Sequence, residues 1–350
     1  MQKLQVCYNI PQRIRLIFFL LLFSNFSFAQ LVDSNRVIIE DGWIEKMNRN
    51  FGFKLSFDNN YETFKVIGQP NDIILYPNIN TNLNLIFSYR FILLKIGFAP
   101  DFLPGNGDED IKGETQTLII SSSFVFKRWF QHLSFRWVEG FYLRNTDDYV
   151  PGWSRGDPYI QFPELAYTGF SGTTSYFFNP RFSIRSFTTE TERQLKSTGS
   201  FIAFLNYRYY IMDNKSIPTQ GGSTQKSNNL DINIGPGYYY TFVFREKFYI
   251  ALGFRPSIGY LNTRLTTRYP SGDEVSYQDN FTFRWHVVGG FGYNIRKFFT
   301  GFYVSASGMR YNQQNTTAVN FDTRAFFELF VGFRIKASDR LNGFFDRLGL

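Results

Sequence analysis

The sequence predicts an all-β protein, namely a transmembrane, antiparallel, up-and-down β-barrel of about twelve strands, within a range of about 10 to 14. Apolar and polar residues alternate along many segments, and several of these segments run for ten residues or more. Strands of soluble sandwiches are usually about five or six residues long, whereas about 9–11 tilted residues cross a bilayer. The chain also begins like an exported protein. A secreted sandwich is therefore the less favoured alternative.

The first segment, residues 1–29, is predicted to be a secretory signal peptide. Three basic residues precede an unbroken apolar run at residues 16–23, and Ser27 and Ala29 supply the small residues of a cleavage site after Ala29. Eight apolar residues are too few to span about 30 Å of hydrocarbon as a helix. We therefore expect the chain to be exported, and the barrel pattern that follows indicates the bacterial outer membrane.

Residues 30–50 show no strand pattern and are expected to be a periplasmic lead-in to a barrel that occupies residues 51–336. Within the barrel segment, side chains of alternating polarity give the period of two that is typical of strands with one apolar face. The clearest stretches are 51–57, 83–89, 133–137, 232–244, 281–287 and 323–335.

The connections between these strands are predicted to alternate in length. Short ones are expected at Tyr89-Arg90, Lys127-Arg128, Asn179-Pro180, Arg245-Glu246 and Arg296-Lys297. Long polar ones are expected at 68–80, 99–114, 144–163, 263–279 and 311–320. Bacterial barrels have short periplasmic turns and longer extracellular loops. A polar stretch at 213–228 breaks this order, which indicates either a missed element between Arg181 and Asn229 or one long periplasmic connection.

The tail at residues 337–350 changes period. Leu341, Phe344, Phe345 and Leu348 recur at the spacing of one helical face. A short amphipathic helix on the inner leaflet and an unstructured end are both compatible with this tail, because so short a helix is marginal alone.

Four stretches carry a resemblance to a known family. They are Tyr76-Pro77-Asn78, Gly140-Phe141-Tyr142-Leu143, Phe178-Asn179-Pro180-Arg181 and the run from Gln194 to Phe201. Together they resemble domain-of-unknown-function family 4421, a set of presumed outer-membrane barrels of Gram-negative bacteria, over about residues 40–335. Thr198 stands where the family pattern leads us to expect a smaller residue such as Ala. The family has no assigned activity, so the resemblance implies an architecture and no site residues.

Composition excludes several classes of function. The chain has one Cys, which lies before the apolar run of the signal peptide, and two His. Multi-thiolate metal sites and zinc sites built from imidazole are therefore not expected, and neither is any cofactor. The basic residues are dispersed through strands of an exported chain, which argues against nucleic acid as a partner.

The side chains predicted to face the lumen are mainly basic. The candidate anion-facing residues are Arg136, Arg208, Arg255, Arg284 and Arg324, with His132 and His286. The carboxylates on the same faces are few, chiefly Asp58, Asp231 and Glu328, whereas acidic residues gather in the long loops. Rings of Arg and Lys select anions in pores. The leading prediction is a non-enzymatic barrel whose lumen passes or binds small anionic solutes.

Two alternatives remain open at the level of sequence. In the first, the arginines pair with the few carboxylates inside a closed structural barrel, and the acidic loops contact lipopolysaccharide or a protein partner. In the second, the barrel is a lipid-modifying hydrolase that uses His132 or His286 as base, with Ser134 on the same strand face as His132. Outer-membrane lipid is an expected partner in every case.

Overall fold

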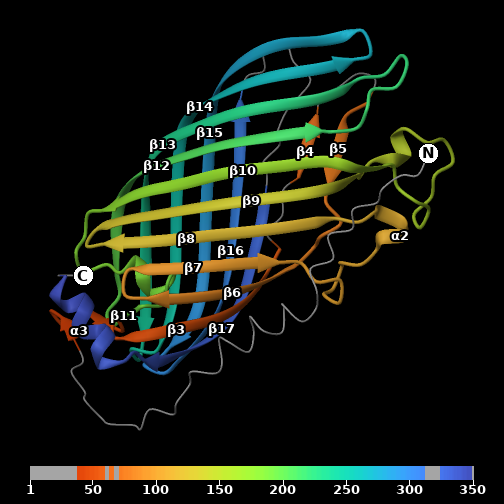
Figure 1. Ribbon diagram of the computed structural model, residues 1–350. Coiled ribbons are helices and arrows are strands. Elements are labelled where there is room, and N and C mark those ends of the chain that lie inside the picture. Colours follow the sequence, from red (N-terminus) through yellow and green to blue (C-terminus); the bar gives the residue numbers. More distant parts are fainter. Residues whose placement is uncertain (1–37, 60–62, 67–70, 312–323, 349–350) are drawn as a thin grey trace. The chain divides into compact units, whose positions relative to one another are not determined.

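The computed structural model describes residues 38–59, 63–66, 71–311 and 324–348, so the predicted signal peptide lies outside the described residues. Twelve antiparallel strands form one closed barrel (Figure 1). They are β3 (Asn50–Asp58), β6 (Asn82–Tyr89), β7 (Ile92–Phe98), β8 (Gln116–Phe126), β9 (Trp129–Leu143), β10 (Gln161–Phe177), β12 (Thr198–Asn214), β13 (Thr224–Phe244), β14 (Phe248–Tyr269), β15 (Gly272–Asn294), β16 (Phe298–Tyr311) and β17 (Arg324–Lys336).

The barrel strands are neighbours in the order in which they occur in the chain. The sheet closes where β17 pairs with β3, in a ladder that runs from Glu328 opposite Asp58 to Lys336 opposite Asn50. The predicted up-and-down barrel and the predicted count of twelve strands are confirmed.

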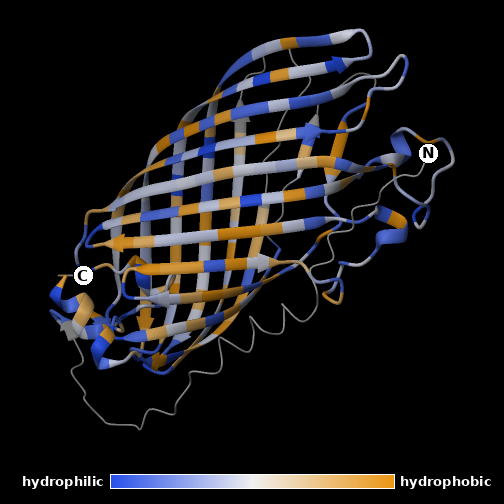
Figure 2. Cartoon of the chain, in the orientation of Figure 1, coloured by the Kyte–Doolittle hydropathy of each residue, from blue (hydrophilic) through white to orange (hydrophobic). Residues whose placement is uncertain are grey.

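Hydrophobic and hydrophilic residues alternate along the strands of the wall, as the sequence pattern requires (Figure 2). On β14, Leu252 and Phe254 are 49% and 50% exposed, whereas Tyr249 and Ala251, which have the opposite parity on the same strand, are buried. Soluble monomers rarely expose an apolar face of this extent. It is the outward band of a transmembrane barrel. No helix in the described part of the chain has the length and hydropathy to cross a membrane.

The two ends of the barrel differ. At one end, which we call the turn end, tight turns join β6 to β7, β8 to β9, β13 to β14 and β15 to β16. At the other, the loop end, lie the connections 99–115, 144–160 and 215–223 and the described parts of 59–81. The connection predicted at 311–320 lies outside the described residues, apart from Tyr311. The stretch 213–228 therefore does not break the order. The strand β12, on which Arg208 lies, carries the chain from the turn end to the loop end before this connection, so the misread element is the segment 178–197.

Two predicted connections were wrong. The segment 263–279 is not a loop, because β14 and β15 continue as a paired hairpin as far as Tyr269 opposite Gly272. The outer-face residues of this hairpin are polar, because strands that project beyond the bilayer need no apolar face. Their polarity therefore resembled that of a loop in the sequence. Asn179-Pro180 is not a short turn either, because the chain between β10 and β12 runs for twenty residues, 178–197.

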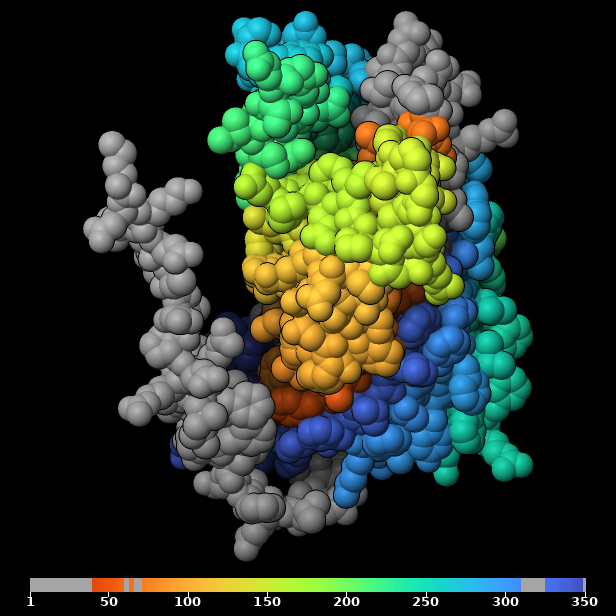
Figure 3. Space-filling model, turned by 90° about the vertical axis from the view of Figure 1, so that its right-hand side faces the viewer, coloured from red at the N-terminus to blue at the C-terminus, as the bar shows by residue number. Residues whose placement is uncertain are grey.

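Smaller elements cover the loop end. β5 (Ile73–Tyr76) pairs with the end of β9, and β4 (Phe64–Val66) pairs with β5. The loops 99–115 and 144–160 contain the short helices α2 (Glu109–Lys112) and η1 (Thr146–Asp148). These two loops lie side by side over the loop end (Figure 3), where the backbone N–H of Tyr159 donates to the carbonyl of Ile111 at 2.8 Å.

Short elements also gather at the turn end. β1 (Ile38–Glu40), β2 (Ile44–Lys46) and β11 (Glu192–Gln194) form a separate three-stranded sheet. Two of these strands lie in the lead-in segment, where no strand was expected. The helix α3 (Asp339–Arg347) begins after Ser338, whose side chain caps the N–H of Leu341. Arg90 holds α3 by an ion pair with Asp346 at 2.7 Å, and this hydrogen bond keeps the pKa of the Asp346 carboxyl below its ordinary value.

The outward band predicts how sensitive the wall is to charge at different depths. We expect Leu252→Arg, on the outer face between the two ends, to destabilise the barrel by about 2–4 kcal/mol, because a cation there faces hydrocarbon. Val275→Arg, on the outer face of the projecting hairpin, is the matched control and should cost about 0–1 kcal/mol. Denaturant unfolding in lipid vesicles measures both. Equal costs for the two variants would contradict the assigned membrane band.

Candidate functional site

The predicted lumen residues whose side chains are described all lie on the inner face of the wall. They gather around one buried carboxylate and two histidines. Only the backbone of Arg324 is described, at the start of β17, so its side chain lies outside the described residues. The contacts of the others decide what the lumen can do.

Asp231, on β13, is the centre of the first group. Its side chain is 2% exposed. Nη2 of Arg208 and Nη2 of Arg284 lie 3.3 Å and 2.7 Å from its Oδ2 atom, while Asn233 donates to Oδ1 at 2.8 Å. Arg284 belongs to β15, two strands away, so it reaches across β14 on the inside of the barrel. Two of the predicted cations thus share a single negative charge.

Arg255 and His286 form the second group. They stand opposite each other on β14 and β15, with Arg255 Nη2 3.2 Å from His286 Nδ1. A guanidinium only donates, so Nδ1 accepts and the neutral ring keeps its proton on Nε2. The guanidinium also lies 5.2 Å from the centre of the Phe204 ring. No carboxylate in the described part of the chain contacts Arg255, and its Nε atom is buried without a hydrogen-bond partner there.

His132 lies on the opposite part of the wall. Its Nδ1 atom is 2.9 Å from Oγ of Ser123, its cross-strand neighbour on β8. Lys95 and Arg255 are both close enough to act on it electrostatically. Ser134, the serine suggested by the sequence, bonds instead to Ser121 at 2.9 Å. Among the described residues no carboxylate contacts His132, so its ring lacks the third group that orients a catalytic histidine.

Two further cations of the lumen are paired. Lys95 bonds to Asp58 at 3.0 Å, and Asp58 is fully buried between amides of Asn82 and Asn84. Lys54 bonds to Glu328 at 3.1 Å. Arg136 is 8% exposed on β9, where its neighbours across the sheet are Ile119 and Gly169. Among the described residues, cations on these inner faces outnumber carboxylates, and Arg255 is a cation that no described carboxylate contacts.

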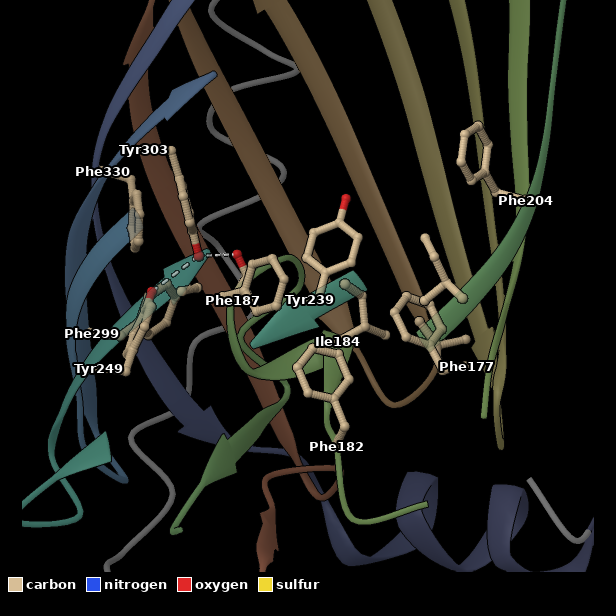
Figure 4. Close-up of a cluster of buried hydrophobic side chains, with 13 residues drawn as sticks. Phe177, Phe182, Ile184, Phe187, Phe204, Tyr239, Tyr249, Phe299, Tyr303 and Phe330 are labelled. Carbon is tan, nitrogen blue, oxygen red and sulfur yellow. Dashed lines mark hydrogen bonds between the residues drawn. The ribbon is translucent and has the colours of Figure 1, made fainter. Parts of the chain in front are cut away.

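The segment 178–197, which we call the plug, fills the lumen at the turn end. Its side chains Phe182, Ile184 and Phe187 lie in one buried cluster with inward residues of the wall (Figure 4). The wall residues of this cluster come from β8, β10, β12, β13, β14, β16 and β17, and include Val125, Phe177, Phe204, Tyr239, Tyr249, Phe299, Tyr303 and Phe330. The plug therefore contacts strands around the wall from inside the barrel at this end.

Hydrogen bonds fix the plug in register with the wall. The hydroxyl of Tyr303 donates to the carbonyl of Phe187, and Tyr249 and Tyr303 bond to each other at 3.1 Å. Arg334 of β17 donates through Nε to the carbonyl of Glu190 at 2.9 Å. Inside the plug, Ser183 bonds to Glu192 at 2.6 Å.

Glu190 is the one carboxyl of the plug that faces the wall cations. Its side chain is 1% exposed and lies 3.7 Å from Lys54. Burial raises the pKa of this carboxyl to about 7, and the attraction of Lys54 and Arg334 only partly offsets the loss of water. The plug therefore contains a group that changes charge near neutral pH.

Sequence reasoning missed the plug. The pair Asn179-Pro180 is a turn signal, and the apolar residues that follow are spaced irregularly, so they match neither a strand nor a helix. The signal that was present is the position of the polar stretch 213–228, which indicated a misread element between Arg181 and Asn229.

A family described as "Domain of unknown function (DUF4421)" matches residues 39–335. No curated protein matches the chain.

Among solved structures, the outer membrane protease OmpT from Escherichia coli is 9% identical and has a TM-score of 0.32, with 82% of this chain and 95% of that chain covered. CdiB from Escherichia coli is 9% identical and has a TM-score of 0.25, with 81% of this chain and 63% of the CdiB chain covered. OpdO from Pseudomonas aeruginosa is 7% identical and has a TM-score of 0.16, with 82% of this chain and 96% of the OpdO chain covered. Likeness this low transfers no activity.

The raised pKa of Glu190 predicts a pH-dependent stability. The folded state holds a proton on this carboxyl up to about pH 7, whereas the unfolded chain releases it near about 4.3. The stability that Glu190 contributes to the folded state is therefore fully present below the pKa of the carboxyl in the unfolded chain. It is lost as the pH rises through the pKa of the carboxyl in the folded state. We expect Glu190→Gln to remove this decline, measured as urea midpoints of both proteins at about pH 5 and about pH 8. The same pH dependence in both proteins would contradict the prediction.

Proposed function

The chain belongs to the DUF4421 family, whose description assigns no activity, and we propose from the lumen geometry that it is a non-enzymatic outer-membrane barrel that binds small anions. The lumen is the binding chamber, and the plug closes it at the turn end. The outer membrane is the location proposed because closed transmembrane barrels with short turns and long loops are built for that membrane, and because the sequence predicts export.

One observation carries the anion proposal. Arg255 lies inside the barrel with a buried Nε donor and without a carboxylate contact among the described residues. Removing a cation from water without a counter-charge is costly. An anion held between Arg255 and the Nε2–H of His286 would supply both the charge and the missing acceptor. A small oxyanion, such as phosphate or a carboxylate, fits donors of this kind.

The plug supports binding over free passage. Its apolar side chains and its hydrogen bonds to the wall seal the turn end, so solute in the lumen has no open path between the two sides of the membrane. Passage then requires the plug to move.

A closed interaction barrel is the second candidate, and the loop end favours it. The loops 99–115 and 144–160 are fixed against each other and carry exposed acidic residues. Such a surface suits a partner that presents cations, or lipopolysaccharide phosphates bridged through divalent ions. Neutralising Asp147, Asp148 and Asp157 together should then abolish binding of lipopolysaccharide by the folded barrel, and should leave phosphate binding unchanged.

Arg255→Gln tests the anion proposal. Titration calorimetry of the folded chain with inorganic phosphate should show affinity falling by about 10- to 100-fold, because one charge-assisted hydrogen bond is worth about 1.5–3 kcal/mol. Arg264→Gln is the matched control, since Arg264 lies on the outer face of the same strand near the loop end. Failure of the unaltered chain to bind phosphate, or equal losses in both variants, would refute the proposal.

Planar-bilayer conductance tests the role of the plug. The full chain should give no stable open steps, because the plug seals the lumen. Replacing Phe182, Ile184 and Phe187 with Ser should release the plug and produce steps that are selective for chloride over potassium. Steady conductance of the full chain would contradict closure, and cation selectivity of the opened variant would contradict a basic lumen.

A further inference from the structure

The turn end carries a belt of exposed cations and aromatic rings on its outer surface. Three of its tight turns each present two cations: Lys127 and Arg128, Arg245 and Lys247, and Arg296 and Lys297. All six side chains are exposed. Glu246 is the single carboxylate in these three turns. The belt is therefore strongly positive.

Most of these cations are not used inside the protein. Arg296 bonds to the buried Glu45 at 2.6 Å and is a structural residue. By contrast, no carboxylate in the described ranges contacts the side chains of Lys127, Arg245, Lys247 or Lys297. Their charges are available to an external partner.

Aromatic side chains lie directly beside these cations on the outer face. Trp129, 54% exposed, contacts Tyr176 with ring centres 5.0 Å apart, and the guanidinium of Arg128 lies 5.1 Å from the Tyr176 ring. Phe244, Phe248 and Phe298 are likewise exposed at the strand ends that carry the other two turns. Exposed aromatic rings at strand ends mark the level of lipid headgroups.

The belt is continuous with the lipid-facing band. Leu252 and Phe254 of the band lie on the strand that begins at Phe248. Cations at this edge stand where phosphates of the adjacent leaflet lie, and basic residues near an anionic membrane surface gain about 1 kcal/mol each. We propose that the turn-end belt binds the phosphate groups of anionic glycerophospholipids in the leaflet that surrounds it.

Trp129 is a built-in reporter for this contact. Brominated phosphatidylglycerol and brominated phosphatidylcholine each quench the fluorescence of Trp129 on contact. The Trp129→Phe variant gives the signal of the other tryptophans, which is subtracted. The ratio of the two quenching curves then gives the relative binding constant of the two lipids at the belt. The full chain in vesicles at low salt should prefer phosphatidylglycerol. Lys127→Gln with Arg128→Gln should reduce the preference by about fivefold for each cation lost.

The control is a pair of exposed cations at the loop end. Arg144→Gln with Arg155→Gln removes the same charge and should leave the preference at Trp129 unchanged. Salt at about 0.5 M should abolish the preference of the unaltered chain, because the screening length of the solution is then only a few ångströms. This measurement uses the unaltered chain, so it does not depend on the folding of any variant. Equal binding of both lipids by the unaltered chain, equal loss in the control pair, or a preference that persists in high salt would each overturn the proposal.

Discussion

Closure of the sheet is the constraint on which the rest of the molecule depends. In hydrocarbon no water satisfies a backbone N–H or C=O, so every strand needs two bonded neighbours. The ladder between β17 and β3 supplies the last pair. Once the sheet is closed, each strand must send alternate side chains to lipid and to a confined interior. The outward positions are apolar for that reason, and the chemistry of the protein is concentrated on the inward ones.

The confined interior explains both the ion pairs and the plug. Buried carboxylates such as Asp58 and Asp231 are tied to cations or amides on neighbouring strands, because an unpaired charge in low dielectric is costly. At the turn end the inward residues are aromatic, and a ring of aromatics around empty space would leave apolar surface in water. Phe182, Ile184 and Phe187 remove that surface. The plug is thus the core of this end of the barrel, supplied by the chain between two strands.

The sequence was sufficient for what depends on local pattern. Period-two alternation predicted the wall, the inward side of Arg208, Arg255 and Arg284, and the count of strands. It did not predict which cation lacks a carboxylate, since Arg284 finds Asp231 from two strands away and that contact depends on the curvature of the closed wall. The plug has no regular period, and the hairpin at 263–279 lies beyond the bilayer, where the polarity signal of a membrane strand disappears.

Charge is distributed unequally along the barrel, and this bears on how an anion would reach Arg255. The loops of the loop end carry exposed carboxylates such as Asp147 and Asp157, whereas the turns of the turn end carry cations such as Arg245 and Lys297. For the proposed anion ligand, carboxylates at the loop end disfavour entry there, whereas cations at the turn end favour approach to the plugged end. The electrostatic gradient therefore favours exchange at the plugged end. Glu190 lies there beside Lys54, and loss of its proton places a second carboxylate next to the Lys54–Glu328 pair. Anion exchange through the lumen would thus be coupled to the packing of the plug, with the free energy of its apolar cluster as the barrier.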